Sequence, residues 1–305
     1  MIPSRFALIL LTFVALSACG GNKPKPNQVF LMPAPGIYEE GQIDPFIDND
    51  PISKGVQPGV LYATDRAVAD EDDSKYDYYS HERGGVLRLG EAYTRLGVDE
   101  GITWEEARKI TLLKNRTENY PLEVTGIDDF GVLQSTIPPF DGDTERSDAA
   151  SDRFREEIRE RLARSESKHV YIYVHGYKVN FENPVLVASE LWHFLGYNGA
   201  FIAYSWPTKF SIWAYVADLE NAINSARNLR TLILDIAEIP EVGKIHVIGY
   251  SAGTRLVSRM LADLGMYGYS PVSYTHLRAH ETMTGISYAV FCLKRGGGGG
   301  GGGGG

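Results

Sequence analysis

The residues that point most directly to chemistry are Gly249-Tyr250-Ser251-Ala252-Gly253, within the stretch "IHVIGYSAGT". The order Gly-x-Ser-x-Gly places a serine at a sharp turn between a strand and a helix, where its hydroxyl can act as a nucleophile. The two glycines lack Cβ atoms, so the turn can pack tightly against its neighbours. The start of the following helix favours negative charge that develops there. The pattern predicts a nucleophile for acyl transfer at Ser251, and the alternative is a purely structural turn.

Strands and helices alternate around this motif. Val170, Ile172 and Val174 alternate with tyrosines in "HVYIYVHGY", which is typical of a strand in a covered sheet. Strand, helix and strand in succession predict parallel pairing with crossovers, and hence an α/β fold with a three-layer, mostly parallel sheet. The predicted strands are 169–177, 200–208 and 244–250, and the predicted helices are 151–167, 184–196, 211–239 and 252–265.

The first half of the chain gives weaker signals. Residues 30–58 are rich in Pro, Gly and Asp and are predicted to be irregular. "GVLYATDR", residues 59–66, is predicted as the first strand, and residues 70–84 as an acidic loop without the spacing of a calcium-binding loop. "GVLRLGEAYTRLG" favours a hairpin strand, and "TWEEARKITLLKN" a helix that begins at a capping box of Thr103 and Glu106.

Several stretches together resemble the α/β-hydrolase superfamily, in an uncharacterised bacterial branch with exported or lipid-anchored members. They are "LYATDR", "VYIYVHGYKVNFENP", "AYSWPT", "AYVADLENAINSARNLRTLI" and "IHVIGYSAGTRLV". The resemblance covers about residues 60–265 and implies that the sheet is of the α/β-hydrolase type. It also implies a nucleophile at Ser251, an acid on a later strand and a histidine on a still later loop. Asp263 lies too close to Ser251 to be that acid.

The resemblance also assigns a role to His175-Gly176-Tyr177. A His-Gly motif after this strand supplies one backbone donor of the oxyanion hole in such hydrolases, and the residue after the nucleophile supplies the other. Here these donors would be the N–H groups of Tyr177 and Ala252. His175 is expected to brace the loop rather than act as the base, because it precedes the nucleophile in the chain.

The end of the chain does not read as natural protein sequence. Residues 272–282 and 286–293 resemble, in frame and in order, a translated sequencing adapter and its primer end, and Gly296–Gly305 is an unbroken glycine run. Residues 271–305 are therefore expected to be an artefactual tail, which removes His276 and His280 as catalytic candidates. The domain is expected to be truncated after the helix that follows Ser251. A chain that ends there should be inactive and prone to aggregate at an exposed sheet edge.

The N-terminus predicts export and lipidation. An apolar run from Phe6 to Leu16 follows a single arginine, and Leu16-Ser17-Ala18-Cys19 resembles a bacterial lipobox. The alternative is a simple signal peptide with an incidental cysteine. The predicted organisation is a signal peptide at 1–18, a tether and irregular segment at 19–58 and a hydrolase domain at 59–270. Lipidation of Cys19 would anchor the protein in the cell envelope. The expected location is the outer membrane, with the protein facing the periplasm.

Composition limits the partners. The formal net charge is -9 over 305 residues, and it becomes -11 without the tail from residue 272, which carries three basic side chains and one acidic side chain. Such acidity disfavours nucleic acid and anionic membranes as main partners. The intact protein is predicted to be a serine hydrolase for a small-molecule or lipid ester, with no cofactor and no metal. A non-catalytic binding protein of the same fold and a structural envelope lipoprotein are the alternatives.

Overall fold

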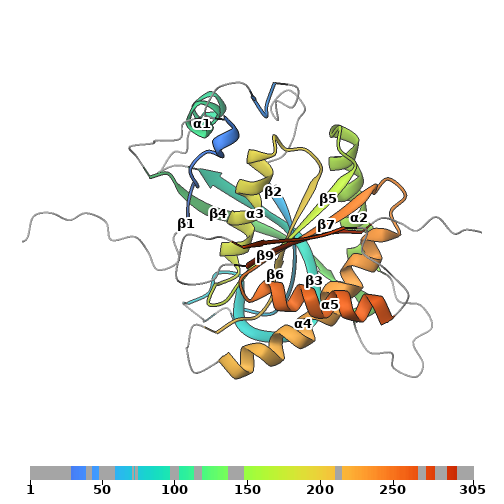
Figure 1. Cartoon of the computed structure of the whole chain (residues 1–305). Coiled ribbons are helices and arrows are strands. Elements are labelled where there is room, and N and C mark those ends of the chain that lie inside the picture. The colour runs from blue at the N-terminus through green and yellow to red at the C-terminus, as the bar shows by residue number, and fades with distance from the viewer. Residues whose placement is uncertain are drawn as a thin grey trace, which may run out of the picture.

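The computed structural model describes residues 29–38, 43–47, 59–70, 72, 75–96, 103–112, 119–136, 148–209, 215–266, 273–278 and 287–293. They form one nine-stranded mixed sheet in the order β1-β4-β3-β2-β6-β5-β7-β9-β8, with helices on both faces (Figure 1). The strands are β1 Val29–Phe30, β2 Gly59–Val68, β3 Tyr79–Leu96, β4 Pro121–Val132, β5 His169–Val174, β6 Ala200–Ser205, β7 Lys244–Tyr250, β8 Ser273–Arg278 and β9 Ser287–Leu293. The α-helices are α1 Trp104–Thr111, α2 Ala149–Arg164, α3 Glu182–Phe194, α4 Tyr215–Ala237 and α5 Gly253–Met266.

The centre of the sheet is parallel. β6 pairs in parallel with β2 on one side and with β5 on the other, and β5 pairs in parallel with β7. These strands are rich in β-branched and aromatic residues because both of their faces are covered. The predicted α/β class is confirmed, and the crossovers that produce it are α3 between β5 and β6 and α4 between β6 and β7.

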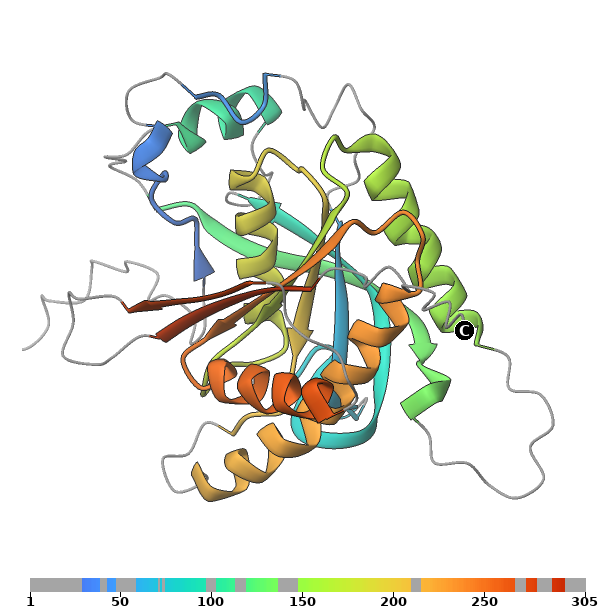
Figure 2. The same ribbon diagram turned by 45° about the vertical axis from the view of Figure 1, so that its right-hand side comes forward.

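Two apolar cores lie on opposite faces of this sheet. On one face, alternate residues of β5, namely Val170, Ile172 and Val174, join the apolar sides of α2, α4 and α5. On the other face, Tyr173 contributes to a core with α3, whose inward residues are Val185, Ala188 and Trp192. Figure 2 shows α4 and α5 side by side along the sheet, with α3 on the other side. The three layers expected from sequence are thus present.

The first half of the chain is antiparallel. β2, β3 and β4 pair successively in antiparallel fashion, and β1 pairs with β4. Helix α1 begins as predicted, since the Thr103 side chain accepts from the N–H of Glu106 and the Glu106 carboxylate accepts from the N–H of Thr103. The predicted acidic loop is too long, because β3 already begins at Tyr79. The strand predicted at 59–66 is present as β2, and it lies in the middle of the sheet.

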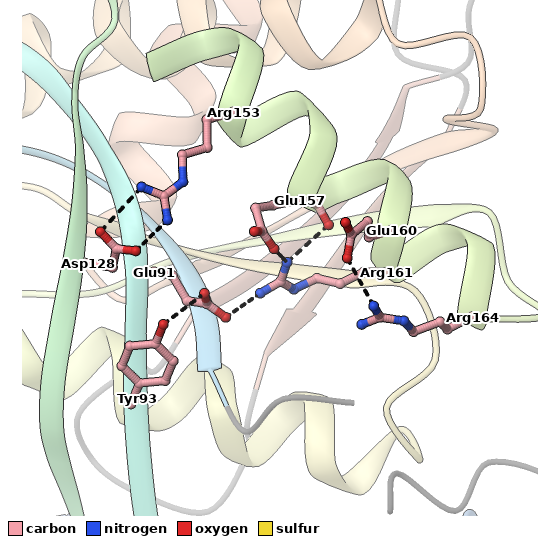
Figure 3. A network of polar contacts seen from close by, with 8 residues as sticks. All are labelled: Glu91, Tyr93, Asp128, Arg153, Glu157, Glu160, Arg161 and Arg164. Carbon is pink, nitrogen blue, oxygen red and sulfur yellow. Dashed lines mark hydrogen bonds and ion pairs between the residues drawn. The ribbon is translucent and has the colours of Figure 1, made fainter. Parts of the chain in front are cut away.

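Charged side chains attach α2 to the antiparallel strands (Figure 3). Arg161 donates to Glu91 on β3 at 2.5 Å, and the two side chains are only 7% and 8% exposed. Arg161 also donates to Glu157 one turn earlier, and Tyr93 donates to the Glu91 carboxylate. Burial raises the pKa of Glu91, although the positive charge of Arg161 opposes that shift.

The far side of the sheet differs from expectation. β9 pairs antiparallel with β7, and β8 pairs with β9. The strand before Ser251 is therefore not an exposed edge, which corrects the prediction that the sheet ends at β7. Both strands fall within 271–305, the segment expected to be artefactual. Residues 279–286 and 294–305 lie outside the described residues, as do residues 1–28 with Cys19.

Candidate active site

The carboxyl ends of four parallel strands meet at one edge of the sheet. Thr64 of β2 is paired with Ser205 of β6, and Val174 of β5 is paired with both Tyr204 of β6 and Gly249 of β7. In open α/β sheets, ligands bind in the crevice outside these ends of the strands. The stretches "ATDR", "YSWP", "VHGY" and "GYSAG" are therefore brought to one place, although they lie far apart in the sequence.

Ser251 occupies a strained turn at this edge. β7 ends at Tyr250 and α5 begins at Gly253, and Ser251 between them has a backbone φ of 51°. A residue with a side chain pays about 1–2 kcal/mol for this left-handed conformation, which the surrounding structure must hold in place. Thr254 helps to hold it, because its N–H and its hydroxyl donate to the Ser251 carbonyl at 3.1 and 2.6 Å. The Ser251 residue is partly exposed, as a nucleophile needs to be.

Glycines allow neighbouring segments to reach this turn. A Cβ atom on Gly176 would lie 3.0 Å from the Cβ of Ser251, so the loop after β5 packs directly against the serine. A Cβ on Gly253 would lie 2.5 Å from the carbonyl oxygen of Val174 and would also strike that of His175. A Cβ on Gly249 would meet Thr254 at 3.1 Å. The two glycines of the motif thus serve close packing between β5, β7 and α5.

The expected oxyanion donors belong to these packed segments. Tyr177 follows Gly176 in the loop after β5, and Ala252 follows Ser251 at the start of α5. Helix starts present unpaired N–H groups and favour developing negative charge. The structure places Ser251 against Gly176, the residue before Tyr177. The roles of Ser251 as nucleophile and of Tyr177 and Ala252 as oxyanion donors stay predictions.

His175 is completely buried between backbone carbonyls. Its Nδ1 lies 2.7 Å from the Gly176 oxygen and its Nε2 lies 3.0 Å from the Trp206 oxygen. The Trp206 ring stacks on the imidazole, and the indole N–H donates to the His175 carbonyl at 2.9 Å. Burial, aided by the charge of Arg66, holds the pKa of His175 well below its usual range. These contacts fit a brace between β5 and β6.

Arg66 is a component of this edge that the sequence reasoning missed. Its guanidinium is buried and donates to the Ser205 hydroxyl at 2.9 Å and to the carbonyls of Ser80 and Val179 at 3.3 and 2.9 Å. It therefore joins β2, β3, β6 and the loop that follows Tyr177. "ATDR" contributed to the family resemblance, but no role was predicted for its arginine. The sequence alone does not show which distant loop a charged side chain in a strand will contact.

Asp65 is the neighbouring buried carboxyl. It accepts from the Asn228 side chain of α4 at 3.0 Å, and burial raises its pKa. It points toward the α4 layer, whereas Arg66 points toward the loop after β5, as alternate residues of a strand do. No role was predicted for Asp65 either.

The remaining histidines form other clusters. His169 and His246 contact each other at 3.1 Å near the amino ends of β5 and β7, away from the edge that holds Ser251. His193 lies in α3 against Tyr197, and His81 lies in β3 rather than in a loop. Among the described side chains, no histidine hydrogen-bonds to the Ser251 hydroxyl. The described residues contain no group of three or more His, Cys, Asp or Glu that could hold a metal ion.

Comparison with known proteins supports the fold assignment. Residues 150–280 match the model of a family described as alpha/beta hydrolase of unknown function (DUF900). No curated protein and no solved structure matches the chain. The matched segment runs from α2 through β8 and contains Ser251, His175 and the parallel strands β5, β6 and β7. By this match and by its central parallel sheet, the chain is similar to the α/β-hydrolase superfamily and has a fold of that type.

Proposed function

We propose that the intact protein is a serine hydrolase that transfers the acyl group of a small-molecule or lipid ester to water. The observation that supports this most is the left-handed Ser251 at the carboxyl edge of the sheet, packed against Gly176. Its hydroxyl would attack the ester carbonyl, and the N–H groups of Tyr177 and Ala252 would stabilise the oxyanion. Each such donor contributes about 3–4 kcal/mol in the transition state.

The base and the acid are proposed to come from native sequence that follows Ser270. The base would accept the Ser251 proton, and the acid would orient the base, as in other serine triads. The first experiment is to read the source DNA onward from the codon for Ser270. An open frame that supplies an acid after a strand and a histidine in a later loop is the expected result.

The activity test uses the protein encoded by that continuous frame. A fluorophosphonate probe should label it, and p-nitrophenyl ester hydrolysis should fall by about 10⁴-fold or more in Ser251→Ala. Ser258→Ala is the matched control, because Ser258 lies on the exposed side of the same helix and donates to the Thr254 carbonyl. Equal labelling of Ser251→Ala and the parent protein would disprove the nucleophile assignment.

A second candidate is a binding protein of the same fold without catalysis. It is favoured by the observation that no described histidine hydrogen-bonds to Ser251. A native frame without a suitable histidine, together with absence of probe labelling, would support it.

We further propose that the protein is exported and anchored through diacylglyceryl attachment at Cys19. No helix in the described ranges is long and apolar enough to cross a membrane. If Cys19 carries the lipid, radiolabelled palmitate should be incorporated into the parent protein and not into Cys19→Ser. Equal incorporation into both would contradict the anchor.

A further inference from the structure

The loop that follows β5 carries the proposed donor Tyr177 and is fixed at its start. His175 is held between backbone carbonyls, and Gly176 packs against Ser251. The next two residues, Tyr177 and Lys178, are only partly buried. Lys178 has a left-handed backbone with a φ of 60°, which a residue other than glycine keeps only where the surrounding structure enforces it. The loop therefore needs a second hold after Lys178.

That hold is at Val179, the residue after Lys178. The Val179 carbonyl accepts from Nη2 of Arg66 at 2.9 Å and from the Thr208 hydroxyl at 3.0 Å, and the Val179 N–H donates to the same hydroxyl at 3.3 Å. Arg66 is 1% exposed and Thr208 is completely buried, so both contacts lie in surroundings where hydrogen bonds are strong. Both polar groups of the Val179 backbone are thus bound by side chains from distant parts of the chain.

Arg66 is suited to this hold because a guanidinium group carries five donors in one plane. Its Nε donates to the Ser205 hydroxyl at 2.9 Å and its Nη1 donates to the Ser80 carbonyl at 3.3 Å, while Nη2 reaches Val179. The first two contacts attach the guanidinium to β6 and β3, so the sheet and not the loop sets its position. The loop is therefore bound to a group that is itself fixed.

We infer that Arg66 is a positioning residue: by holding Val179, it keeps the Tyr177 N–H where the oxyanion of the transition state forms. This inference rests on the proposed function. A backbone donor stabilises an oxyanion only if it is in place before the reaction, and a misplacement of about 1 Å can lower the rate about 10²-fold. Val179 is two residues after Tyr177, so a shift of its backbone would pass through the strained Lys178 to the donor. Thr208 contributes to the same hold from the segment after β6.

The test uses the protein encoded by the continuous native frame and relates each rate to the number of reactive sites. Fluorophosphonate labelling carried to completion counts the folded molecules whose Ser251 reacts, and p-nitrophenyl ester hydrolysis then gives kcat per site and KM. We expect kcat per site to fall about 10²-fold in Arg66→Gln and about tenfold in Thr208→Val, with KM within about twofold of the parent value. A role in folding alone would lower the number of labelled sites and leave kcat per site unchanged. Thr208→Val nearly keeps the side-chain shape, so it decides the question if Arg66→Gln does not fold.

Asn228→Ala is the matched control, because Asn228 donates to Asp65, the neighbour of Arg66 that points to the other side of β2. It should lower thermal stability and leave kcat per site unchanged. Hydrogen exchange tests the hold without any activity, since residues 176–181 should exchange faster in Arg66→Gln and in Thr208→Val but not in Asn228→Ala.

The outcomes separate this inference from the proposed function. Unchanged kcat per site or unchanged exchange of residues 176–181 in both Arg66→Gln and Thr208→Val would overturn the inference alone. A parent protein that neither reacts with the fluorophosphonate nor hydrolyses esters would refute the proposed function, and the inference with it.

Discussion

In the antiparallel half of the sheet, charged side chains meet in pairs, whereas in the parallel half the polar groups at the strand ends bind backbone. Arg88 pairs with Asp129 at 2.8 Å, Arg95 pairs with Glu123 at 2.9 Å and Arg161 pairs with Glu91. By contrast, His175 and Trp206, which directly follow β5 and β6, each contact the other's backbone carbonyl, and Thr64 donates to the Ser205 carbonyl of β6. In the first half these pairs join one element to another, while in the second half the contacts of His175, Trp206 and Thr64 also fix the path of the backbone.

This difference bears on function. A surface ion pair can be lost without moving the main chain, because its partners are free to hydrate. A buried side chain that holds a carbonyl, or a glycine that admits a neighbouring strand, cannot be changed without shifting the backbone around it. The half with fixed backbone is the half that presents Ser251, and preorganised backbone donors are what stabilise a transition state.

The largest expected effect is that of removing the Arg161 side chain. It tests whether the burial of an ion pair, rather than its location in the antiparallel half, determines how much the pair contributes to the free energy of unfolding. Arg161→Ala leaves the Glu91 carboxylate buried without its partner and should lower the free energy of unfolding by about 3–5 kcal/mol. Urea denaturation measures it. The control is Arg95→Ala, whose side chain is 41% exposed in its pair with Glu123, and it should lower the free energy by about 1 kcal/mol or less. Equal losses in the two variants would contradict the comparison.

Gly253 tests the fixed backbone of the parallel half. The added methyl of Gly253→Ala would meet the carbonyls of Val174 and His175, which cannot move aside as a side chain could. We expect the free energy of unfolding to fall by about 1–3 kcal/mol and Ser251 to react more slowly with a fluorophosphonate. Gly265→Ala is the matched control on the same helix, since nothing lies within 4 Å of its Cβ position. It should be stabilised by up to about 1 kcal/mol, and destabilisation of equal size at both positions would refute the packing argument.

His193 gives a pH-dependent test. Unlike the ion pairs above, it is a buried side chain that is neutral in the folded protein. Burial lowers its pKa from 6.5 to about 4, and its ring contacts the hydroxyls of Thr111 and Tyr197. Between these two pKa values the unfolded chain binds the proton and the folded protein does not, so stability is full above pH 6.5 and is lost as pH falls toward 4. At about pH 5 His193 alone should account for a loss of about 2 kcal/mol relative to neutral pH.

Urea denaturation at both pH values measures this loss, and His193→Gln provides the comparison. The glutamine amide can still donate and accept hydrogen bonds but does not titrate. The variant should lose about 2 kcal/mol less than the parent on acidification. An unchanged pH dependence would show that other groups cause the acid sensitivity.

The sequence predicted the parallel half well, because its strands and helices are strongly periodic. Val170, Ile172 and Val174 identified β5, and the Gly-x-Ser-x-Gly pattern placed Ser251 between β7 and α5. The helix start at Thr103 was also correct, since a capping box is a local signal. These elements are determined by residues that are close in the chain.

Long-range features could not be predicted in the same way. The strand at 59–66 was predicted, but its place in the sheet was not: β2 lies between β3 and β6, because it pairs with residues far along the chain. The positions of Arg66 and Asp65 depend on that pairing. β4 was not predicted, although "PLEVTGIDDFGV" contains several strand-forming residues, because its face is only partly buried and its apolar alternation is weak.

The central place of β2 has a consequence for synthesis on the ribosome. Thr64 of β2 bonds to Ser205 of β6, and 141 positions separate them in the chain. At about 5–20 residues per second, roughly 7–28 s pass between the appearance of the two strands. During that interval the antiparallel hairpins can form, but one side of β2 has no partner and its apolar residues have no cover. The nascent chain therefore exposes an unpaired, aggregation-prone strand edge for much of its translation. We expect chaperones to bind this edge until β6 emerges.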